Sequence, residues 1–428
     1  MNLLSLLWRY YGIRRLHFTS RDALERRQIK KLNAFRQRVL SASPWFSRYL
    51  SVPFEQWPVM DKALMMTHFD EMNTQGLRRD ELMACALESE QSRDFSPGIG
   101  CFSVGLSSGT SGRRGLFVVS PEEQQIWAAA VLAKALPDGL FAGERVALFL
   151  RADNNLYKSV NNRWLKLDFY DLLAPFREQL TKLEIFSPTI IVAPAQVLRA
   201  LALEVSAGTL QLSVKKVISV AEVLDAQDRE LLNRIFGNTG EIYQATEGFL
   251  ASSCVCGTLH LNEEFIYVEP EWLDERRFIP VITDFTRRTQ PIVRYRLDDV
   301  LVAGDKPCPC GSAARVIERI EGRQDDQLLL PAVSGKTAVI FADACNRVLA
   351  ITLPVTTDYR LIQTAEDSLL LTADCGRDML EICRDALCHF FTEQGIDTAR
   401  LTWTTEQRTL LPDFGTKRRR IIRQWGRK

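Results

Sequence analysis

The segment "TIIVAPAQVLRALALEV" (residues 189–205) contains a short apolar run followed by a helical pattern. Its β-branched residues predict a buried strand, and the spacing of the later apolar residues predicts a helix. The same order continues in "KKVISV" (215–220), "DAQDRELLNRIF" (225–236) and "GEIYQA" (240–245), with Asp225 placed to cap the second helix. Short strands that alternate with helices are typical of an α/β fold, in which helices cover parallel or mixed sheets.

The segments before this alternating region are mainly helical in pattern, although "ERVALFL" (144–150) predicts one more buried strand. "SRDALERRQIKKLNAFRQRVL" (20–40) predicts a long helix with Ser20 as its N-cap. The expected buried face of that helix consists of Leu24, Ile29, Leu32, Phe35 and Leu40.

The end of the chain has a different pattern. "YRLIQTAEDSLLLTAD" (359–374) predicts a hairpin that turns near Glu366, "RDMLEICRDALCHFFTEQ" (377–394) an amphipathic helix, and "ARLTWTT" (399–405) a strand. This pattern predicts a small α+β unit, and the polar cluster "EGRQDD" (321–326) marks its boundary. We therefore expect two domains, residues 1–324 and 325–428.

Composition excludes several classes of protein. The 428 residues are 46% apolar and 25% charged with a net charge of +1, so no overall field favours nucleic acid or an acidic membrane. The apolar run in residues 1–15 is too short to span a bilayer; a helix packed on the body is favoured over an interfacial anchor. The ten cysteines are consistent with a reducing compartment. We expect a cytoplasmic protein without stable membrane insertion or a nucleic-acid partner.

The segment "GLSSGTSGRRG" (105–115) is a candidate phosphate-binding loop. Small residues let backbone N–H groups approach an anion, serine and threonine hydroxyls add donors, and Arg113 and Arg114 follow. The loop lacks the lysine of the P-loop pattern. Taken alone, such a stretch is more often a plain flexible connection.

Four further motifs follow in order: "YQATEG" (243–248), "RYRLDD" (294–299), "EGRQDD" (321–326) and "LPDFGTKRRR" (411–420). Together with the loop they resemble the motifs of the adenylate-forming superfamily of acyl- and aryl-CoA ligases. The chain is most similar to the phenylacetate-CoA ligase branch, which includes relatives that adenylate aryl acids or a deazaflavin cofactor. The short chain, the "SSGTSG" form of the loop and "CPCG" (308–311) support that branch. The resemblance covers nearly the whole chain, and it implies a large adenylation domain followed by a small mobile domain.

The resemblance implies roles in ATP binding for residues of the large domain. Glu247 is expected to hold Mg²⁺, Thr246 to bond the α-phosphate, and Asp299 to accept both ribose hydroxyls, with Asp298 an alternative surface charge. In "SVAEVL" (219–224) two residues are expected beside adenine, and Tyr243 is expected to stack on it or to be a core aromatic. The full implied ATP-binding set is Ser107, Ser108, Gly109, Thr110, Ser111, Gly112, Ala221, Glu222, Tyr243, Gln244, Asp299 and Arg323.

The resemblance also implies the parts of a moving domain. Arg323 is expected to reach the ribose, Asp325 to be the hinge, and Lys417 to be the catalytic lysine that bridges carboxylate and α-phosphate oxygens. The alternative for the basic residues around Lys417 is a solvated tail or one that contacts RNA.

The implied activity is that of an AMP-forming ligase. A small carboxylic acid, expected to be aromatic, reacts with ATP and Mg²⁺ to give an acyl-adenylate and pyrophosphate, and the acyl group then passes to a thiol, most simply coenzyme A. Adenylyl transfer, or transfer to an acyl carrier protein or an amine, is the alternative. A non-catalytic nucleotide-binding partner is a third interpretation.

Two other clusters bear on ligands. Cys254 and His260, with Cys308 and Cys310 about fifty residues later, have the composition of a structural Cys₃His zinc site, with Cys256 as a substitute for Cys254. Reduced cysteines near turns are the alternative. The acid pocket is expected in "RADNNLYKSVNNRW" (151–164) and "APAQ" (193–196), where amide and aromatic groups favour a planar, hydroxylated aryl or arylacrylic acid over a long fatty acid. Those groups are Asn154, Asn155, Tyr157, Asn161 and Trp164. An exposed loop is the alternative for residues 151–164.

Overall fold

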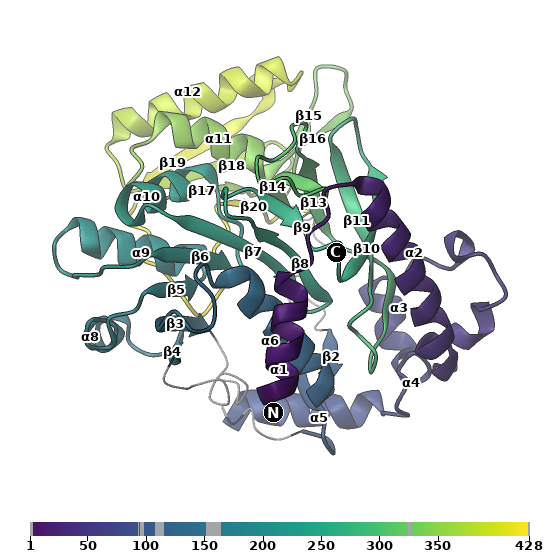
Figure 1. Ribbon diagram of the computed structural model, residues 1–428. Coiled ribbons are helices and arrows are strands. Elements are labelled where there is room, and N and C mark those ends of the chain that lie inside the picture. Colours follow the sequence, from purple (N-terminus) through teal and green to yellow (C-terminus); the bar gives the residue numbers. More distant parts are fainter. Residues whose placement is uncertain are drawn as a thin grey trace.

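The computed structural model describes residues 3–92, 94, 98–107, 115–150, 164–323 and 327–426. Helices precede the first strand, and further helices alternate with strands (Figure 1). The α-helices of the described residues are α1 (Leu3–Arg14), α2 (Arg21–Arg38), α3 (Lys62–Thr67), α4 (Phe69–Met72), α5 (Arg79–Ser92), α6 (Pro121–Ala135), α8 (Phe176–Phe186), α9 (Ala195–Ser206), α10 (Ala226–Phe236), α11 (Ala342–Thr352) and α12 (Arg377–Glu393).

A 12-stranded sheet forms the centre of the molecule, and one half of it is parallel. The parallel strands lie in the order β4-β3-β5-β6-β7. They are β3 (Glu144–Leu150), β4 (Leu165–Asp171), β5 (Ile190–Ala193), β6 (Lys216–Val220) and β7 (Thr239–Ala245). Helices α9 and α10 connect successive parallel strands, which confirms the expected α/β alternation.

The other half of the sheet is antiparallel, and periodicity did not predict its individual strands. It continues from β7 in the order β8-β9-β14-β13-β11-β10, with β12 paired to β11. Its strands are β8 (Gly248–Ser253), β9 (Leu259–Leu261), β10 (Ile266–Trp272), β11 (Arg277–Asp284), β12 (Ile292–Arg296), β13 (Asp299–Ala303) and β14 (Val316–Arg323). A separate hairpin, β1 (Ser103–Leu106) with β2 (Leu116–Val119), flanks the candidate phosphate loop.

The C-terminal segment has its own sheets and its own core. Strands β15 (Leu328–Pro331) and β16 (Thr337–Ile340) form a hairpin, and a four-stranded sheet has the order β19-β18-β17-β20. That sheet consists of β17 (Tyr359–Gln363), β18 (Ser368–Ala373), β19 (Thr402–Gln407) and β20 (Ile421–Arg423). The expected hairpin turn, helix and strand are all present. The proposed boundary at residues 324–325 lies outside the described residues.

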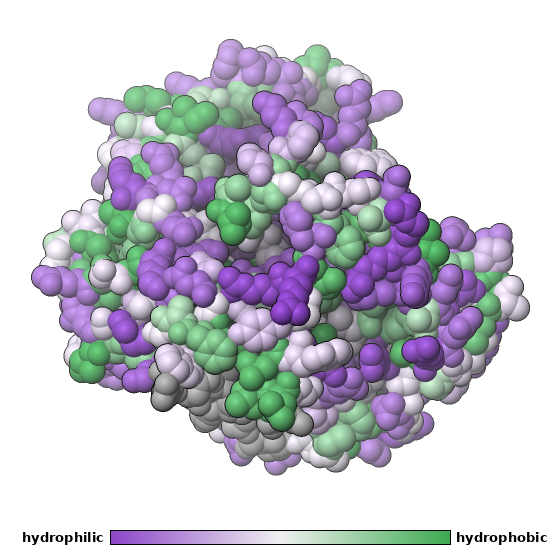
Figure 2. All heavy atoms as spheres, viewed as in Figure 1, coloured by the Kyte–Doolittle hydropathy of each residue, from purple (hydrophilic) through white to green (hydrophobic). Residues whose placement is uncertain are grey.

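Helix α1 packs along α6 and buries Leu6 and Tyr10 there, as expected of a helix on the body (Figure 1). Leu4 and Trp8 on the outer side of α1 are exposed. Apolar side chains gather in the region of this helix in Figure 2. Ser20 is the N-cap residue of α2, but its side chain makes no capping hydrogen bond. The prediction that Ile29 lies in the buried face of α2 is wrong, since its side chain is 58% exposed. None of the described helices is both long and apolar enough to cross a membrane.

Candidate active site

The candidate site lies where β6 and β7 end, at the carboxyl edge of the parallel strands. Loops at this edge commonly bind ligands in open α/β sheets. Tyr243, near the end of β7, is buried and its Oη donates a hydrogen bond of 2.6 Å to Asp299 Oδ2 at the start of β13. The structure thus brings two predicted nucleotide-binding residues together, and the phenol orients the carboxylate. Gln244 follows on β7 and is exposed, as is Asp298, the alternative surface charge.

Thr246 and Glu247 form the turn between β7 and β8. Thr246 Oγ1 donates to Glu247 Oε2 at 2.8 Å, and the Glu247 side chain is almost fully buried. Burial and the neighbouring Glu247 carboxylate raise the pKa of Tyr295 far above its usual range. Gly248 has no room for a side chain, because an added Cβ would lie 2.6 Å from Asp284 Oδ2. The position therefore requires glycine directly after Glu247.

The candidate phosphate loop begins and ends at a closed pair of residues. Ser107 and Gly115 exchange two hydrogen bonds of 2.7 Å: the Ser107 amide donates to the Gly115 carbonyl, and the Gly115 amide donates to Ser107 Oγ. The predicted phosphate-binding residues Ser108, Gly109, Thr110, Ser111 and Gly112, with Arg113 and Arg114, lie outside the described residues. The structure therefore places the base of this loop.

Arg287 and Gln290, which the sequence did not indicate, lie between β2, the strand after this loop, and the turn that follows β7. The buried Arg287 side chain donates to the Thr246 carbonyl at 2.8 Å and to the Val118 carbonyl at 3.4 Å. The Gln290 side chain accepts from the Val118 amide at 3.0 Å and donates to the Leu116 carbonyl at 3.1 Å. It therefore forms with β2 the hydrogen bonds that a neighbouring strand would form. No short motif marks either residue; "TRRTQP" (286–291) only indicates a polar loop.

The segment after β6, expected to lie beside adenine, begins with a strained residue. Ala221 has a φ of 65°, in the left-handed region that alanine seldom adopts. The next carboxylate, Glu222, accepts hydrogen bonds from the Gln196 amide at 3.0 Å and from Gln196 Nε2 at 2.8 Å. Burial raises the pKa of Glu222 above its ordinary value despite these donors. Gln196 belongs to "APAQ", one of the two segments expected to line the acid pocket.

The loop that carries Lys417, residues 411–419, docks on these same groups. Asp413 forms its turn by accepting from the Gly415 amide at 3.0 Å and from Thr416 Oγ1 at 2.8 Å. The Thr416 carbonyl accepts from Gln196 Nε2 at 2.7 Å, and the Arg418 amide donates to Glu222 Oε1 at 3.1 Å. Lys417, which is half-buried, therefore stands between two residues anchored beside the end of β6.

Three arginines and three aspartates form a cluster of ion pairs that anchors the C-terminal side of this loop. Asp228, fully buried in α10, is paired with Arg418, with Arg420 at 3.1 Å and with Arg199 at 2.8 Å. Arg420 also pairs with Asp225, and with Asp358 at 2.8 Å. We call these six residues the buried ion cluster. Arg418 and Arg420 are thus buried groups, and the interpretation of "KRRR" as a solvated tail is wrong for both.

The charges in the buried ion cluster balance. Burial alone raises the pKa of Asp228, but the guanidinium groups of Arg418, Arg420 and Arg199 outweigh it and hold the pKa well below its usual range. Asp225 keeps its predicted role as the N-cap of α10, since its Oδ1 accepts from the Asp228 amide at 3.0 Å. The sequence indicated the cap and did not indicate that the same aspartate pairs with Arg420, which follows it by 195 positions.

Other predicted site residues are placed only in part. The backbone of Arg323 pairs with Asp299 in the register of β13 and β14. The hinge candidate Asp325 and the pocket candidates Asn154, Asn155, Tyr157 and Asn161 lie outside the described residues. Trp164 is 39% exposed and packs edge-on against Phe141.

The predicted metal ligands meet at one point. The ligand atoms of Cys254, His260, Cys308 and Cys310 all lie within 4.8 Å of one another. Cys254 Sγ is 3.6 Å from Cys308 Sγ, and Cys310 Sγ is 3.5 Å from His260 Nε2. His260 Nδ1 lies 3.0 Å from the Ala314 carbonyl, which leaves Nε2 facing the thiols. An outer hydrogen bond of this kind orients metal-binding histidines.

The surroundings of Cys308 favour its thiolate, whereas those of Cys310 favour its thiol. Burial opposes ionisation of Cys308, but hydrogen bonds from Thr258 and from the Cys310 amide lower its pKa to about 6. Burial raises the pKa of Cys310 to about 12. Cys256 is exposed, and its amide donates to Cys254 Sγ at 3.3 Å.

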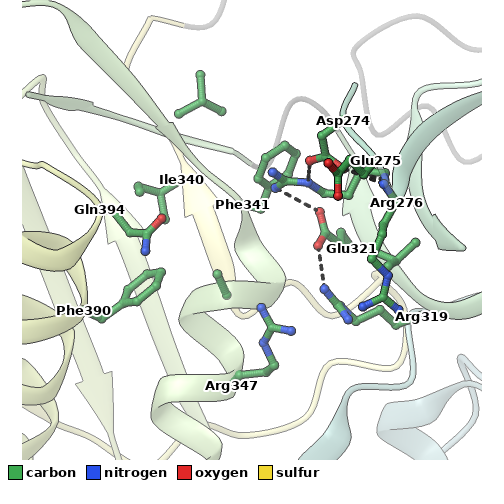
Figure 3. Close-up of a pocket in the computed structure, with 14 residues that line it drawn as sticks. Asp274, Glu275, Arg276, Arg319, Glu321, Ile340, Phe341, Arg347, Phe390 and Gln394 are labelled. Atoms are coloured by element: carbon green, nitrogen blue, oxygen red, sulfur yellow. Dashed lines mark hydrogen bonds and ion pairs between the residues drawn. The ribbon is translucent and has the colours of Figure 1, made fainter. Parts of the chain in front are cut away.

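A charged pocket of about 650 Å³ lies between the central sheet and the C-terminal helices (Figure 3). Arg319 on β14 pairs with Glu321 at 3.1 Å and with Asp343 at 2.8 Å, and Asp343 lies at the start of α11. Arg277 lies over the Phe341 ring at 4.3 Å. These contacts are a second connection between the two parts of the chain, distant in sequence from the lysine loop.

No protein-family model and no curated protein matches the chain. Its structure is similar to that of 2-hydroxyisobutyryl-CoA ligase in the postadenylation state in complex with R3-HIB-AMP. The sequence identity is 16%, the TM-score is 0.66, and the alignment covers 93% of this chain and 89% of that chain. Against the same ligase in complex with 2-HIB-AMP and CoA in the thioesterification state the identity is 16%, the coverage 96% and 92%, and the TM-score 0.56.

A further similarity is to the amide bond synthetase McbA from Marinactinospora thermotolerans, with 13% identity, 73% of this chain and 66% of that chain covered, and a TM-score of 0.51. At these identities the comparisons concern the fold. They confirm the fold that the five motifs led us to expect, that of adenylate-forming enzymes, with a smaller C-terminal part.

Proposed function

We propose that this chain is an AMP-forming ligase that activates a small carboxylic acid as an acyl-adenylate and transfers the acyl group to a thiol, most simply coenzyme A. The observation that carries the proposal is the convergence of separate motifs on the carboxyl edge of the parallel strands. Arg287 bonds the turn at Thr246 to β2, the strand that follows the small-residue loop. Gln196 and Glu222 bond the loop around Lys417 at the end of β6.

Each group has a distinct task in this reaction. Asp299, oriented by the Tyr243 hydroxyl at 2.6 Å, accepts the ribose hydroxyls, and Thr246 bonds the α-phosphate. The acid's carboxylate oxygen forms a bond to the α-phosphorus as the bond to pyrophosphate breaks. Lys417 supplies a positive charge to the oxygens on which charge builds. A thiol then attacks the activated carbonyl, and AMP leaves.

Magnesium fits the buried carboxylate at the β7–β8 turn. Glu247 offers oxygen donors, which a hard divalent cation prefers, and its neighbour Thr246 Oγ1 lies 2.8 Å away. Bound there with ATP, the ion would neutralise charge on phosphate oxygens. The hydroxyl groups of Thr246 and Tyr295, which bond Glu247, would orient that carboxylate.

The activity test is pyrophosphate release from ATP with a panel of carboxylic acids, each with and without coenzyme A. We expect release with small acids and turnover only when coenzyme A is present. Release that is indifferent to coenzyme A would favour adenylyl transfer, or a carrier-protein or amine acceptor, as McbA is an amide bond synthetase. Absence of release with every acid would favour the non-catalytic interpretation.

We further propose that residues after 324 move as a domain about Asp325 between the two half-reactions. The higher TM-score against the postadenylation complex, 0.66 compared with 0.56, supports the interpretation that the present arrangement belongs to the adenylation half. A cross-link between cysteines introduced at Thr416 and Gln196 in a background without reactive surface cysteines tests this. It should preserve adenylation and stop thiol transfer; equal retention of both steps would contradict the movement.

The Cys/His cluster fits a tetrahedral structural zinc site, and we propose Cys254, His260, Cys308 and Cys310 as its ligands. Three thiols and one imidazole are the donors that zinc prefers, and the four side chains join the β8–β9 turn to the loop before β14. Metal analysis of protein purified without chelator should give one zinc per chain. Cys310→Ser should lower that ratio and the unfolding temperature, whereas Cys101→Ser, at an exposed cysteine far along the chain, should change neither. A metal-free wild type would contradict the site.

A further inference from the structure

An apolar cavity of about 100 Å³ lies between α6 and the parallel half of the central sheet. Alternate residues of three strands face it, because side chains two apart lie on one face of a strand. They are Val146, Leu148 and Leu150 of β3, Ile190 and Val192 of β5, and Ile242 and Gln244 of β7. Helix α6 covers the opposite side with residues at helical spacing, among them Ala128, Val131 and Ala135.

Among the described residues that line the cavity none is charged, and Gln244 is the single amide side chain. A carboxylate or ammonium transferred into such surroundings would lose its hydration without gaining a partner, which is strongly unfavourable. The volume is close to that of engineered apolar cavities of about 150 Å³ that take up benzene. The cavity therefore suits a ring or a short branched chain, and it is too small for a long alkyl chain.

The cavity reaches the candidate active site at Gln244. This residue is exposed, lines the cavity, and lies between Tyr243, which bonds Asp299, and the turn at Thr246. An acid whose carboxylate lies at this turn can extend its body past Gln244 toward α6. Val220, which precedes the strained Ala221, also lines the cavity.

We propose that this cavity binds the body of the acid, so that the substrate is a small acid with an uncharged, mainly hydrocarbon body of about four to seven carbons. The proposal rests on the proposed function. It replaces the expectation of a hydroxylated planar acid, because several hydroxyl groups would find too few partners among the described residues of this wall. Ala128 and Val131 of α6, which line the cavity, are then specificity-determining residues.

The first test measures kcat/KM for pyrophosphate release with acids whose bodies differ in length and charge. We expect 4-methylpentanoate and benzoate to exceed dodecanoate and adipate by about 100-fold or more, since a single methylene of misfit changes kcat/KM by about 10-fold or more. Adipate tests the charge, and dodecanoate tests the length. Dodecanoate or adipate within about 10-fold of 4-methylpentanoate would overturn the proposal and leave the ligase activity standing.

Filling the cavity gives an independent measurement. Ala128→Leu should shift the preference from 4-methylpentanoate toward isobutyrate by about 10-fold, and Ala133→Leu, on α6 outside the cavity wall, should not. If Ala128→Leu fails to fold, Val131→Phe tests the same space. An unshifted preference in the folded variant would overturn the assignment.

A binding measurement separates this proposal from the ligase activity. If no acid supports pyrophosphate release, the proposed function fails, but the cavity can still be probed with benzene alone. Benzene should then raise the unfolding temperature of the wild type and not that of Ala128→Leu or Val131→Phe. No stabilisation of the wild type by benzene would show that the cavity takes up no such ligand.

Discussion

The buried ion cluster and the charged pocket both join the C-terminal segment to the rest of the chain, and both do so with arginine and carboxylate pairs. They differ in burial. In the buried ion cluster the side chains of Asp228 and Arg420 are 0% and 3% exposed, whereas Arg319 and Arg347 at the pocket are 25% and 47% exposed. Water and salt screen exposed pairs strongly and buried pairs weakly. The same residue types therefore hold the lysine loop firmly in one region and connect surfaces loosely in the other.

The difference teaches where the position of Lys417 is determined. Arg418, adjacent to the lysine, is fixed by Asp228 through its side chain and by Glu222 through its amide. The pocket residues connect β14 to α11 (Figure 3). Breaking the buried ion cluster should thus displace the lysine, and breaking the pocket pairs should not.

The largest expected effect follows from Asp228→Asn. The substitution keeps the shape of the side chain and leaves three buried arginines with two aspartates. Removing one partner from a buried pair commonly costs about 3–5 kcal/mol, because the remaining charge stays buried. We expect a lower midpoint of urea unfolding and faster proteolysis in the C-terminal segment. A midpoint equal to that of the wild type would show that water reaches the cluster.

Lys417→Ala tests the catalytic end of the same loop. Losing one preorganised charge donor commonly lowers the rate by about 100- to 1000-fold. We expect that loss in pyrophosphate release, with thiol transfer from a supplied acyl-adenylate nearly unchanged. The unfolding midpoint should also stay close to that of the wild type, since Arg418 and Arg420 still hold the loop. Equal loss in both half-reactions would contradict the assignment of Lys417.

The pH dependence of stability sharpens the assignment to Asp228. Its folded pKa lies below the ordinary value of 3.8, so its contribution is complete above pH 3.8 and is lost as pH falls toward the folded pKa. The difference in unfolding free energy between wild type and Asp228→Asn should be constant from pH 5 to 8. Below pH 3.8 it should shrink by about 1.4 kcal/mol per pH unit. A difference that shrinks already near pH 6 would assign the effect to another group.

Local patterns predicted much of this molecule, and pairings between distant residues did not follow from them. The parallel strands and the cap at Asp225 follow from periodicity and capping chemistry, which act within a few residues. The Cys/His cluster was also predictable, because thiols and imidazoles spaced around two turns have few other uses. The pairing of Asp228 with Arg418 joins positions 190 apart, and only the folded chain brings them together.

Ile29 and the antiparallel strands are features that local sequence patterns did not predict correctly. Ile29 follows Leu24 by five positions, so it points away from the helical face that buries Leu24, Leu32 and Phe35, and it stays in solvent. The antiparallel half buries polar residues through hydrogen bonds, among them Asp284 at the end of β11 and Asn262 and Glu263 in the turn after β9. Periodicity did not predict these strands, since burial of a polar group depends on partners elsewhere in the chain.

The smallest expected effect belongs to the charged pocket and serves as the control for the buried ion cluster. Asp343→Asn removes a carboxylate that pairs with Arg319 at 2.8 Å and with Arg347 at 3.5 Å, but both arginines keep access to water. Pairs near the surface contribute about 0–1 kcal/mol, and salt weakens them. We expect a small shift of the urea midpoint that disappears at about 1 M salt, with adenylation unchanged. The loss caused by Asp228→Asn should persist at the same salt concentration, because its partners are buried. If both substitutions responded equally to salt, burial would not explain the difference between the two regions.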